Sequence, residues 1–174
     1  ETDFTAPTLP LVFPANSTTL TVPIMPLSDT LAEGPQTATL GILTGAAYTV
    51  GVPSSATVTL ADLPIDDWRF GQFGAQANNA LIAGDLMDVD FDGIANRLEY
   101  YFGLPAAVAN FDGLPIVQKQ NIAGTDYLTL TFIRSKSAID VSGRVQSGSG
   151  LTESSWTDID PDSLVYQVDL KDNV

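Results

Sequence analysis

The chain has 174 residues, of which 44% are hydrophobic, so it is long and apolar enough for one or two buried cores. Its 21 acidic and 7 basic residues give a net charge of −14, which argues against nucleic acids and anionic membranes as partners. The sequence contains no cysteine and no histidine, which excludes disulfides, thiolate or histidine metal sites and catalytic triads, so we expect no enzyme activity. No apolar run approaches the length of a membrane span, and no membrane insertion is expected within this segment.

Residues 1–63 have the polarity pattern of short β-strands. Threonine, valine and leucine alternate in runs that are separated by turn clusters rich in Pro, Asn, Ser and Asp, a pattern typical of an antiparallel β-sandwich. Pro23 lies within one run and favours an edge position there, because proline cannot donate to a strand ladder. The expected strands are Leu9–Phe13, Thr18–Met25, Thr37–Leu43 and Ala56–Leu60.

Residues 64–104 are predicted to form a short helical connector. Asp66 and Asp67 are expected to cap a helical turn over Trp68–Phe73. A second helix is expected over Asn96–Phe102, because Gly103 followed by Pro105 is a helix stop signal.

The segment from Asp88 to Glu99 has the ligand spacing of an EF-hand calcium loop. Aspartates at its first, third and fifth positions, a glycine at the sixth and a glutamate at the twelfth supply oxygens and the sharp turn that calcium requires. Gly93 permits this turn because it has no Cβ to clash at positive φ. The alternative interpretation is a solvated acidic turn before a helix. The expected Ca²⁺ ligands are Asp88, Asp90, Asp92, the backbone carbonyl of Ile94, Asn96 and the bidentate Glu99.

Residues 105–174 return to a strand pattern and predict a small β-sandwich-like domain. The predicted strands are Leu114–Gln118, Tyr127–Ile133, Val141–Val145 and Leu164–Leu170. The expected fold is therefore mainly β, with two incomplete antiparallel β-sandwich modules (1–63 and 105–174) joined by the calcium-loop connector of residues 64–104.

The first segment resembles the later part of a Calx-beta domain. The resemblance is carried by Asp3-Phe4-Thr5, by the strand pair around Pro14-Ala-Asn16, by the signature Asp29–Gly34 and by the closing strand Ala56–Asp62. It implies that the early strands of such a domain lie upstream of Glu1. It also implies that Glu33 and Asp62 are remnants of the family's calcium site, although Pro35-Gln36 and Leu63-Pro64 stand where that family carries further acidic residues. The alternative interpretation of Glu33 and Asp62 is a solvated turn.

The middle segment resembles a connector of large secreted or surface proteins of environmental bacteria. Its marks are Trp68–Gly74 and the loop of residues 88–99, which is similar to single calcium loops of dockerins and of thrombospondin-type repeats. A dockerin needs two such loops. The final segment resembles the small β-domain that often follows this connector, and both ends of the chain read like the middle of a longer protein.

The resemblance implies a calcium-stabilised structural or adhesive module of a large extracellular or cell-surface bacterial protein. Its expected partners are calcium and the flanking domains or neighbouring subunits that complete open sheet edges. One alternative is an accessory polysaccharide- or protein-binding module of a secreted hydrolase. Another is a filament subunit that donates a strand to its neighbour.

Overall fold

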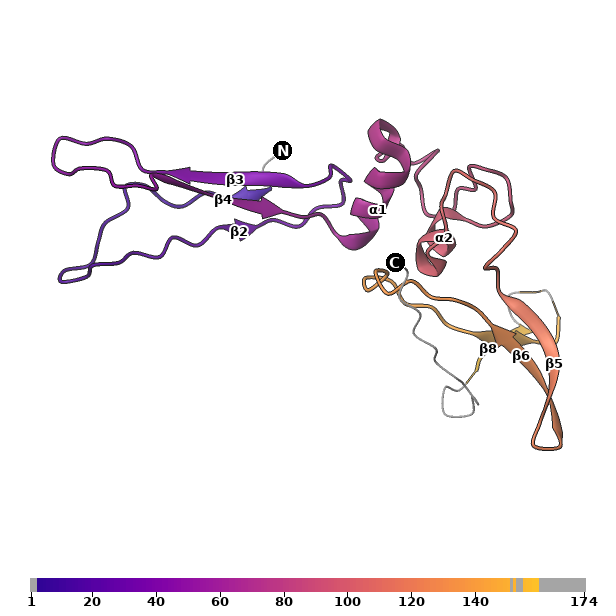
Figure 1. Ribbon diagram of the computed structural model, residues 1–174. Coiled ribbons are helices and arrows are strands. Elements are labelled where there is room, and N and C mark those ends of the chain that lie inside the picture. Colours follow the sequence, from indigo (N-terminus) through magenta and orange to yellow (C-terminus); the bar gives the residue numbers. More distant parts are fainter. Residues whose placement is uncertain (1–2, 151, 153–154, 160–174) are drawn as a thin grey trace. The chain divides into compact units, whose positions relative to one another are not determined.

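The computed structural model describes residues 3–150, 152 and 155–159, and the chain divides into two compact units, Glu1–Ala83 and Gly84–Val174 (Figure 1). The division falls inside the segment 64–104, so this segment contributes one helix to each unit. The strand predicted over Leu164–Leu170 lies outside the described residues.

Two antiparallel strand pairs build the first unit. β1 (Phe4–Thr5) pairs with β2 (Met25–Pro26), and the longer β3 (Gln36–Gly41) pairs with β4 (Ser55–Leu60) (Figure 1). β3 keeps the expected period of two, because its central residue Ala38 is buried between exposed threonines.

Two strands predicted for the first unit are wrong in their extent. The structure has no strand at Leu9–Phe13, and of Thr18–Met25 only Met25 lies in a strand. Pro10 and Pro23 interrupt these two runs and cannot donate a ladder hydrogen bond, which explains why alternation alone predicted too much pairing.

A helix closes the first unit. α1 (Pro64–Phe73) starts two residues before Asp66, so the prediction that Asp66 and Asp67 cap it is wrong. Pro64 occupies the first turn of the helix. Both aspartates lie inside that turn, where the positive end of the helix dipole stabilises negative charge. The 3₁₀ turn η1 (Gly74–Gln76) follows directly.

The second unit contains the shorter helix α2 (Asn96–Phe102). It ends at Gly103 in the left-handed conformation, with φ of 76°, as the sequence predicts. Tyr100 is buried on this helix, and Tyr101 and Phe102 pack with Phe132 at ring centroid distances of 6.4 and 6.0 Å.

The remaining strands of the second unit form two hairpins. β5 (Ile116–Ile122) pairs with β6 (Thr125–Thr131), and the short β7 (Gln146–Gly148) pairs with β8 (Trp156–Asp158). The predicted strand Val141–Val145 is instead irregular chain.

Among the described residues every sheet is a two-stranded antiparallel pair, so the fold is mainly β with few helices. The same residues contain no helix that is long and apolar enough to cross a membrane.

Candidate metal centres

The loop of residues 88–99 brings three carboxylates together in the second unit. Oxygens of Asp88, Asp90 and Asp92 lie within 4.8 Å of one another. The loop backbone holds them there: the N–H of Asp92 donates to Asp88 Oδ1 and Asp90 Oδ1 at 3.2 Å, and the N–H of Gly93 donates to Asp88 Oδ2 at 2.9 Å. The expected ligands at the first, third and fifth positions are therefore gathered at one point.

Two residues with positive φ give the loop its sharp turn around the three carboxylates. Gly93 has a φ of 93°, as the calcium-loop pattern requires, and the N–H of the following Ile94 donates to Asp92 Oδ1 at 2.8 Å. Phe91 has a φ of 62°, which is uncommon for a bulky residue, and its side chain is 89% exposed. The aromatic ring thus points away from the three carboxylates, as expected for an even position of the loop.

Hydrogen bonds join Asn96, at the ninth position of the loop, to the residues that precede the loop. The N–H of Asn96 donates to the carbonyl of Met87 at 2.8 Å, and its Nδ2 donates to the carbonyl of Gly84 at 2.9 Å. Arg97 pairs with Asp85 at 2.9 Å on the surface. Asn96, expected as a ligand, is buried at the start of α2 and also closes the loop. A turn over residues 84–87 thereby occupies the place that an incoming helix has in a paired EF-hand.

Glu99, the twelfth position, is completely buried. Asn110 Nδ2 donates to its Oε1 at 3.3 Å, whereas no group among the described residues donates to its Oε2. Burial, together with the charges of Asp90, Asp92 and Asp88, raises the pKa of Glu99 to about 7. A buried carboxylate beside three others is costly to ionise unless a cation balances the charge. The unpartnered Oε2 is thus an orphaned buried acceptor of the kind that a metal ion satisfies.

Asn110 is a part of this centre that the sequence pattern did not predict. It lies 11 residues after Glu99, yet its backbone N–H donates to Asp92 Oδ2 at 2.7 Å. This hydrogen bond is the main reason that the pKa of Asp92 falls below its usual value. No spacing rule relates Asn110 to the loop, and only the return of the chain after α2 brings it there.

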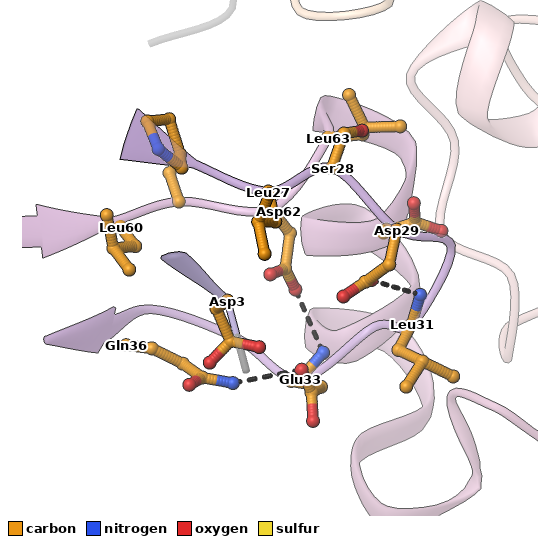
Figure 2. Close-up of a pocket in the computed structure, with 13 residues that line it drawn as sticks. Asp3, Leu27, Ser28, Asp29, Leu31, Glu33, Gln36, Leu60, Asp62 and Leu63 are labelled. Atoms are coloured by element: carbon orange, nitrogen blue, oxygen red, sulfur yellow. Dashed lines mark hydrogen bonds between the residues drawn. The ribbon is translucent and has the colours of Figure 1, made fainter. Parts of the chain in front are cut away.

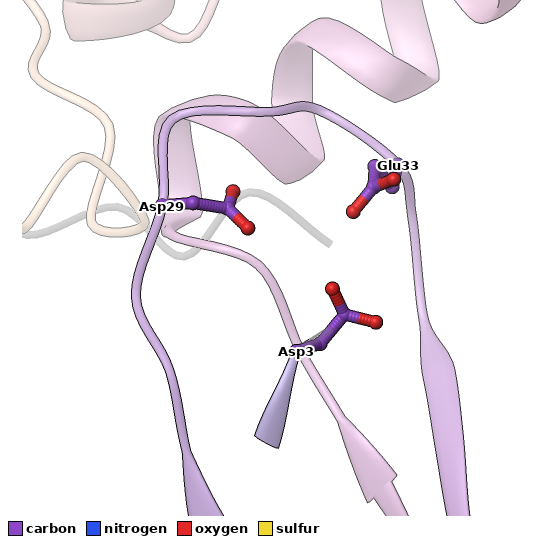
Figure 3. A group of neighbouring side chains, drawn as sticks. All are labelled: Asp3, Asp29 and Glu33. Carbon is purple, nitrogen blue, oxygen red and sulfur yellow. The ribbon is translucent and has the colours of Figure 1, made fainter. Parts of the chain in front are cut away.

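A second carboxylate cluster lies in the first unit. Oxygens of Asp3, Asp29 and Glu33 come within 4.8 Å of one another, and Figure 3 shows the three carboxylates directed toward a common point. Asp3 Oδ1 is buried and accepts no hydrogen bond from the described residues. Asp29 was not predicted as a ligand, because its approach to Asp3 depends on the tertiary fold.

The structure gives the two residues expected at this site different roles. Glu33 belongs to the carboxylate cluster, whereas Asp62 Oδ2 accepts a hydrogen bond of 2.9 Å from the N–H of Glu33 (Figure 2). The same oxygen accepts a second hydrogen bond of 2.9 Å from the N–H of Gly34. Asp62 therefore holds the backbone that carries Glu33. Both line a pocket of about 230 Å³ that also includes Asp3 and Asp29.

Neighbouring contacts fix the segment that carries Asp29 and Glu33. The N–H of Leu31 donates to Asp29 Oδ1 at 2.8 Å (Figure 2). Asn78 exchanges two hydrogen bonds with the backbone of Ala32, at 2.8 and 3.0 Å. Gly34, with a φ of 77°, lies so close to the Phe70 ring that a Cβ there would be 2.7 Å from a ring carbon.

Both clusters offer only oxygen donors, the ligand set of hard divalent cations such as calcium and magnesium. Either cluster can thus hold a metal ion. Comparison of the chain with protein-family models, curated proteins and solved structures gives no match.

Proposed function

We propose that this chain is a calcium-stabilised structural or adhesive module of a large extracellular bacterial surface or matrix protein, with its principal calcium ion at Asp88–Glu99. The observation that carries the proposal is the fully buried Glu99, whose Oε2 has no donor among the described residues and whose charge interacts with those of Asp88, Asp90 and Asp92. Calcium takes six to eight oxygens, and the loop offers them from Asp88, Asp90, Asp92, Ile94, Asn96 and Glu99.

A structural role fits this loop better than a sensing role. Sensor EF-hands open a helix pair and expose a hydrophobic groove, whereas here a turn over residues 84–87 precedes the loop. Extracellular calcium modules bind with a Kd of about 10⁻⁴–10⁻³ M, which suits a site that is permanently filled outside the cell. The resemblance to dockerin-like and thrombospondin-type loops supports the same assignment.

Calcium titration by calorimetry tests the proposal. We expect binding in the millimolar to submillimolar range by the natural chain, and a loss of affinity of at least about tenfold in Glu99→Gln, because even indirect metal contacts are worth that much. Asp126→Asn is the matched control, since Asp126 is a carboxylate of the same unit that pairs with Lys119 on the surface. An unchanged isotherm for Glu99→Gln would refute the loop as the binding site.

A second calcium ion at Asp3, Asp29 and Glu33 is the finer proposal for the first unit. The buried, unpartnered Asp3 Oδ1 and the resemblance to a Calx-beta domain support it. In the same titration this site would raise the stoichiometry above one, and Asp29→Asn would remove the extra binding. A stoichiometry of one that Asp29→Asn leaves unchanged contradicts the second site.

We also propose that the strand pairs belong to incomplete β-sandwiches, which flanking domains or neighbouring subunits complete. The hairpin β5–β6 supports this, because Val117, Leu128 and Leu130 share one of its faces and are 62%, 80% and 40% exposed. Apolar strand faces of this kind normally pack on a second sheet. The size of the chain in solution distinguishes flanking domains from neighbouring subunits. A monomer contradicts completion by neighbouring subunits, so that flanking sequence of the same polypeptide would have to complete the sandwiches.

A further inference from the structure

Asn110 joins the calcium loop to the chain that follows α2. Its backbone N–H donates to Asp92 Oδ2 at 2.7 Å, and its side-chain Nδ2 donates to Glu99 Oε1 at 3.3 Å. The same Nδ2 donates to the carbonyl of Pro105 at 3.0 Å. One residue therefore contacts the fifth and twelfth positions of the loop and the start of its own segment.

These contacts occupy oxygens that matter for metal binding. Asp92 has one oxygen engaged by Ile94 and the other by Asn110, which fixes the plane of this carboxylate. In Glu99, Oε1 accepts a hydrogen bond from Asn110 Nδ2, whereas Oε2 has no donor among the described residues. Groups that hydrogen-bond to metal ligands set their orientation, and their loss typically weakens metal binding by about 10–100-fold.

The same contacts allow a cation in the loop to affect the segment that carries Asn110. In residues 103–113, which lead from α2 toward β5, Ala106 is buried, whereas Val108 and Phe111 are 63% and 85% exposed. A cation that holds Asp92 and Glu99 in place also holds the acceptors to which Asn110 donates. The coupling free energy between two events is the same in both directions. If ordering of the segment raises calcium affinity, calcium binding therefore favours the ordered segment by the same amount.

We propose that Asn110 is a positioning residue that couples calcium occupancy of the loop to the ordering of residues 103–113. This inference rests on the proposed calcium site. Calcium bound at the loop thereby also orders the chain that leads toward β5, beyond helix α2, which carries the ligands Asn96 and Glu99. The module is stiffened over a longer stretch than the twelve-residue loop itself.

Amide hydrogen exchange of the full chain, in saturating calcium and in chelator, tests this coupling. In the natural chain we expect calcium to slow exchange of the residue 110 amide by about tenfold, within the usual range of such couplings. In Asn110→Ala the same amide remains measurable. There the backbone N–H of residue 110 still donates to Asp92, but the Nδ2 contacts with Glu99 and Pro105 are lost. We therefore expect the calcium effect at residues 103–113 to fall to about threefold, with calcium protection of the loop amides retained at saturation.

Asn121→Ala is the matched control, because Asn121 hydrogen-bonds only within its own hairpin, to Asp126 and Gly124, in the contacts described. It should keep the full calcium effect at residue 110. A purely structural role of Asn110 would speed exchange of the segment equally with and without calcium, and that result overturns the coupling.

The outcomes separate the two proposals. Calcium protection of the loop without protection of residues 103–113 in the natural chain refutes the coupling and leaves the calcium site intact. An undiminished calcium effect in Asn110→Ala also refutes it. No calcium effect at the loop amides refutes the proposed site and the coupling with it.

Discussion

Replacing Glu99 by glutamine should stabilise the calcium-free second unit and weaken its calcium binding by at least about tenfold. Glutamine keeps the shape of the side chain and the acceptor for Asn110 Nδ2, but it removes a buried negative charge that faces Asp88, Asp90 and Asp92. The stabilisation tests the burial of this charge, and the weakened calcium response tests Glu99 as a ligand.

The magnitude follows from the pKa of Glu99. Its rise from 4.5 to about 7 corresponds to about 3 kcal/mol, at about 1.4 kcal/mol for each tenfold change. Since the folded chain holds this proton more tightly than the unfolded chain, the free energy of unfolding falls as pH rises from about 4.5 to about 7. Without calcium, Glu99→Gln should therefore exceed the natural chain by up to about 3 kcal/mol at pH 8 and by almost nothing at pH 4.5. Calcium at a hundredfold the Kd of the natural chain adds about 2.7 kcal/mol to the natural chain and at most about 1.4 kcal/mol to a variant that binds tenfold more weakly.

Urea unfolding measures this difference if the probe reports on the second unit only. The chain has two tryptophans, Trp68 in the first unit and Trp156 in the second, so the fluorescence of Trp156 in a Trp68→Phe background isolates the second unit. Glu33→Gln, a glutamate of the first unit, is the control and should leave this transition unchanged. A calcium-free Glu99→Gln chain that is less stable than the natural one at pH 8, or an advantage that persists at pH 4.5, would refute the reasoning.

Two further predictions follow from the same contacts. Calcium should bind about tenfold more weakly at pH 6 than at pH 8, because calcium binding needs ionised Glu99. Only about a tenth of that carboxyl is ionised one pH unit below its pKa of about 7. Calorimetry at the two pH values checks this, and equal affinities contradict it. Gly34→Ala should lower the free energy of unfolding of the first unit by about 1–3 kcal/mol, since its Cβ would meet the Phe70 ring at a positive φ. Urea unfolding followed by Trp68 fluorescence in a Trp156→Phe background measures it, with Gly41→Ala as control because no atom lies within 4 Å of the added Cβ; equal losses in both variants would show that the ring contact is irrelevant.

Local signals in the sequence predicted the elements whose causes are local. The end of α2 at Gly103 and the alternation along β3 depend on neighbours within one turn or one strand, and both are confirmed. The strand predicted at Leu9–Phe13 is wrong, because a partner must supply the ladder and alternation does not reveal whether one is present. The start of α1 was misplaced although its cause is local, since Pro64 at the first turn outweighed the cap signal of Asp66.

The sequence by itself determined the convergence of Asp88, Asp90 and Asp92, because a twelve-residue loop with a glycine at its sixth position carries its own geometry. Only the tertiary structure decided that Glu99 is fully buried and that Asn110 returns to Asp92 and Glu99. It alone also brought Asp29 to Asp3 and turned Asp62 toward the backbone of Glu33. Ligands within one loop are placed by short-range backbone geometry, whereas contacts between distant segments depend on how the chain packs, and no spacing in the sequence records that packing.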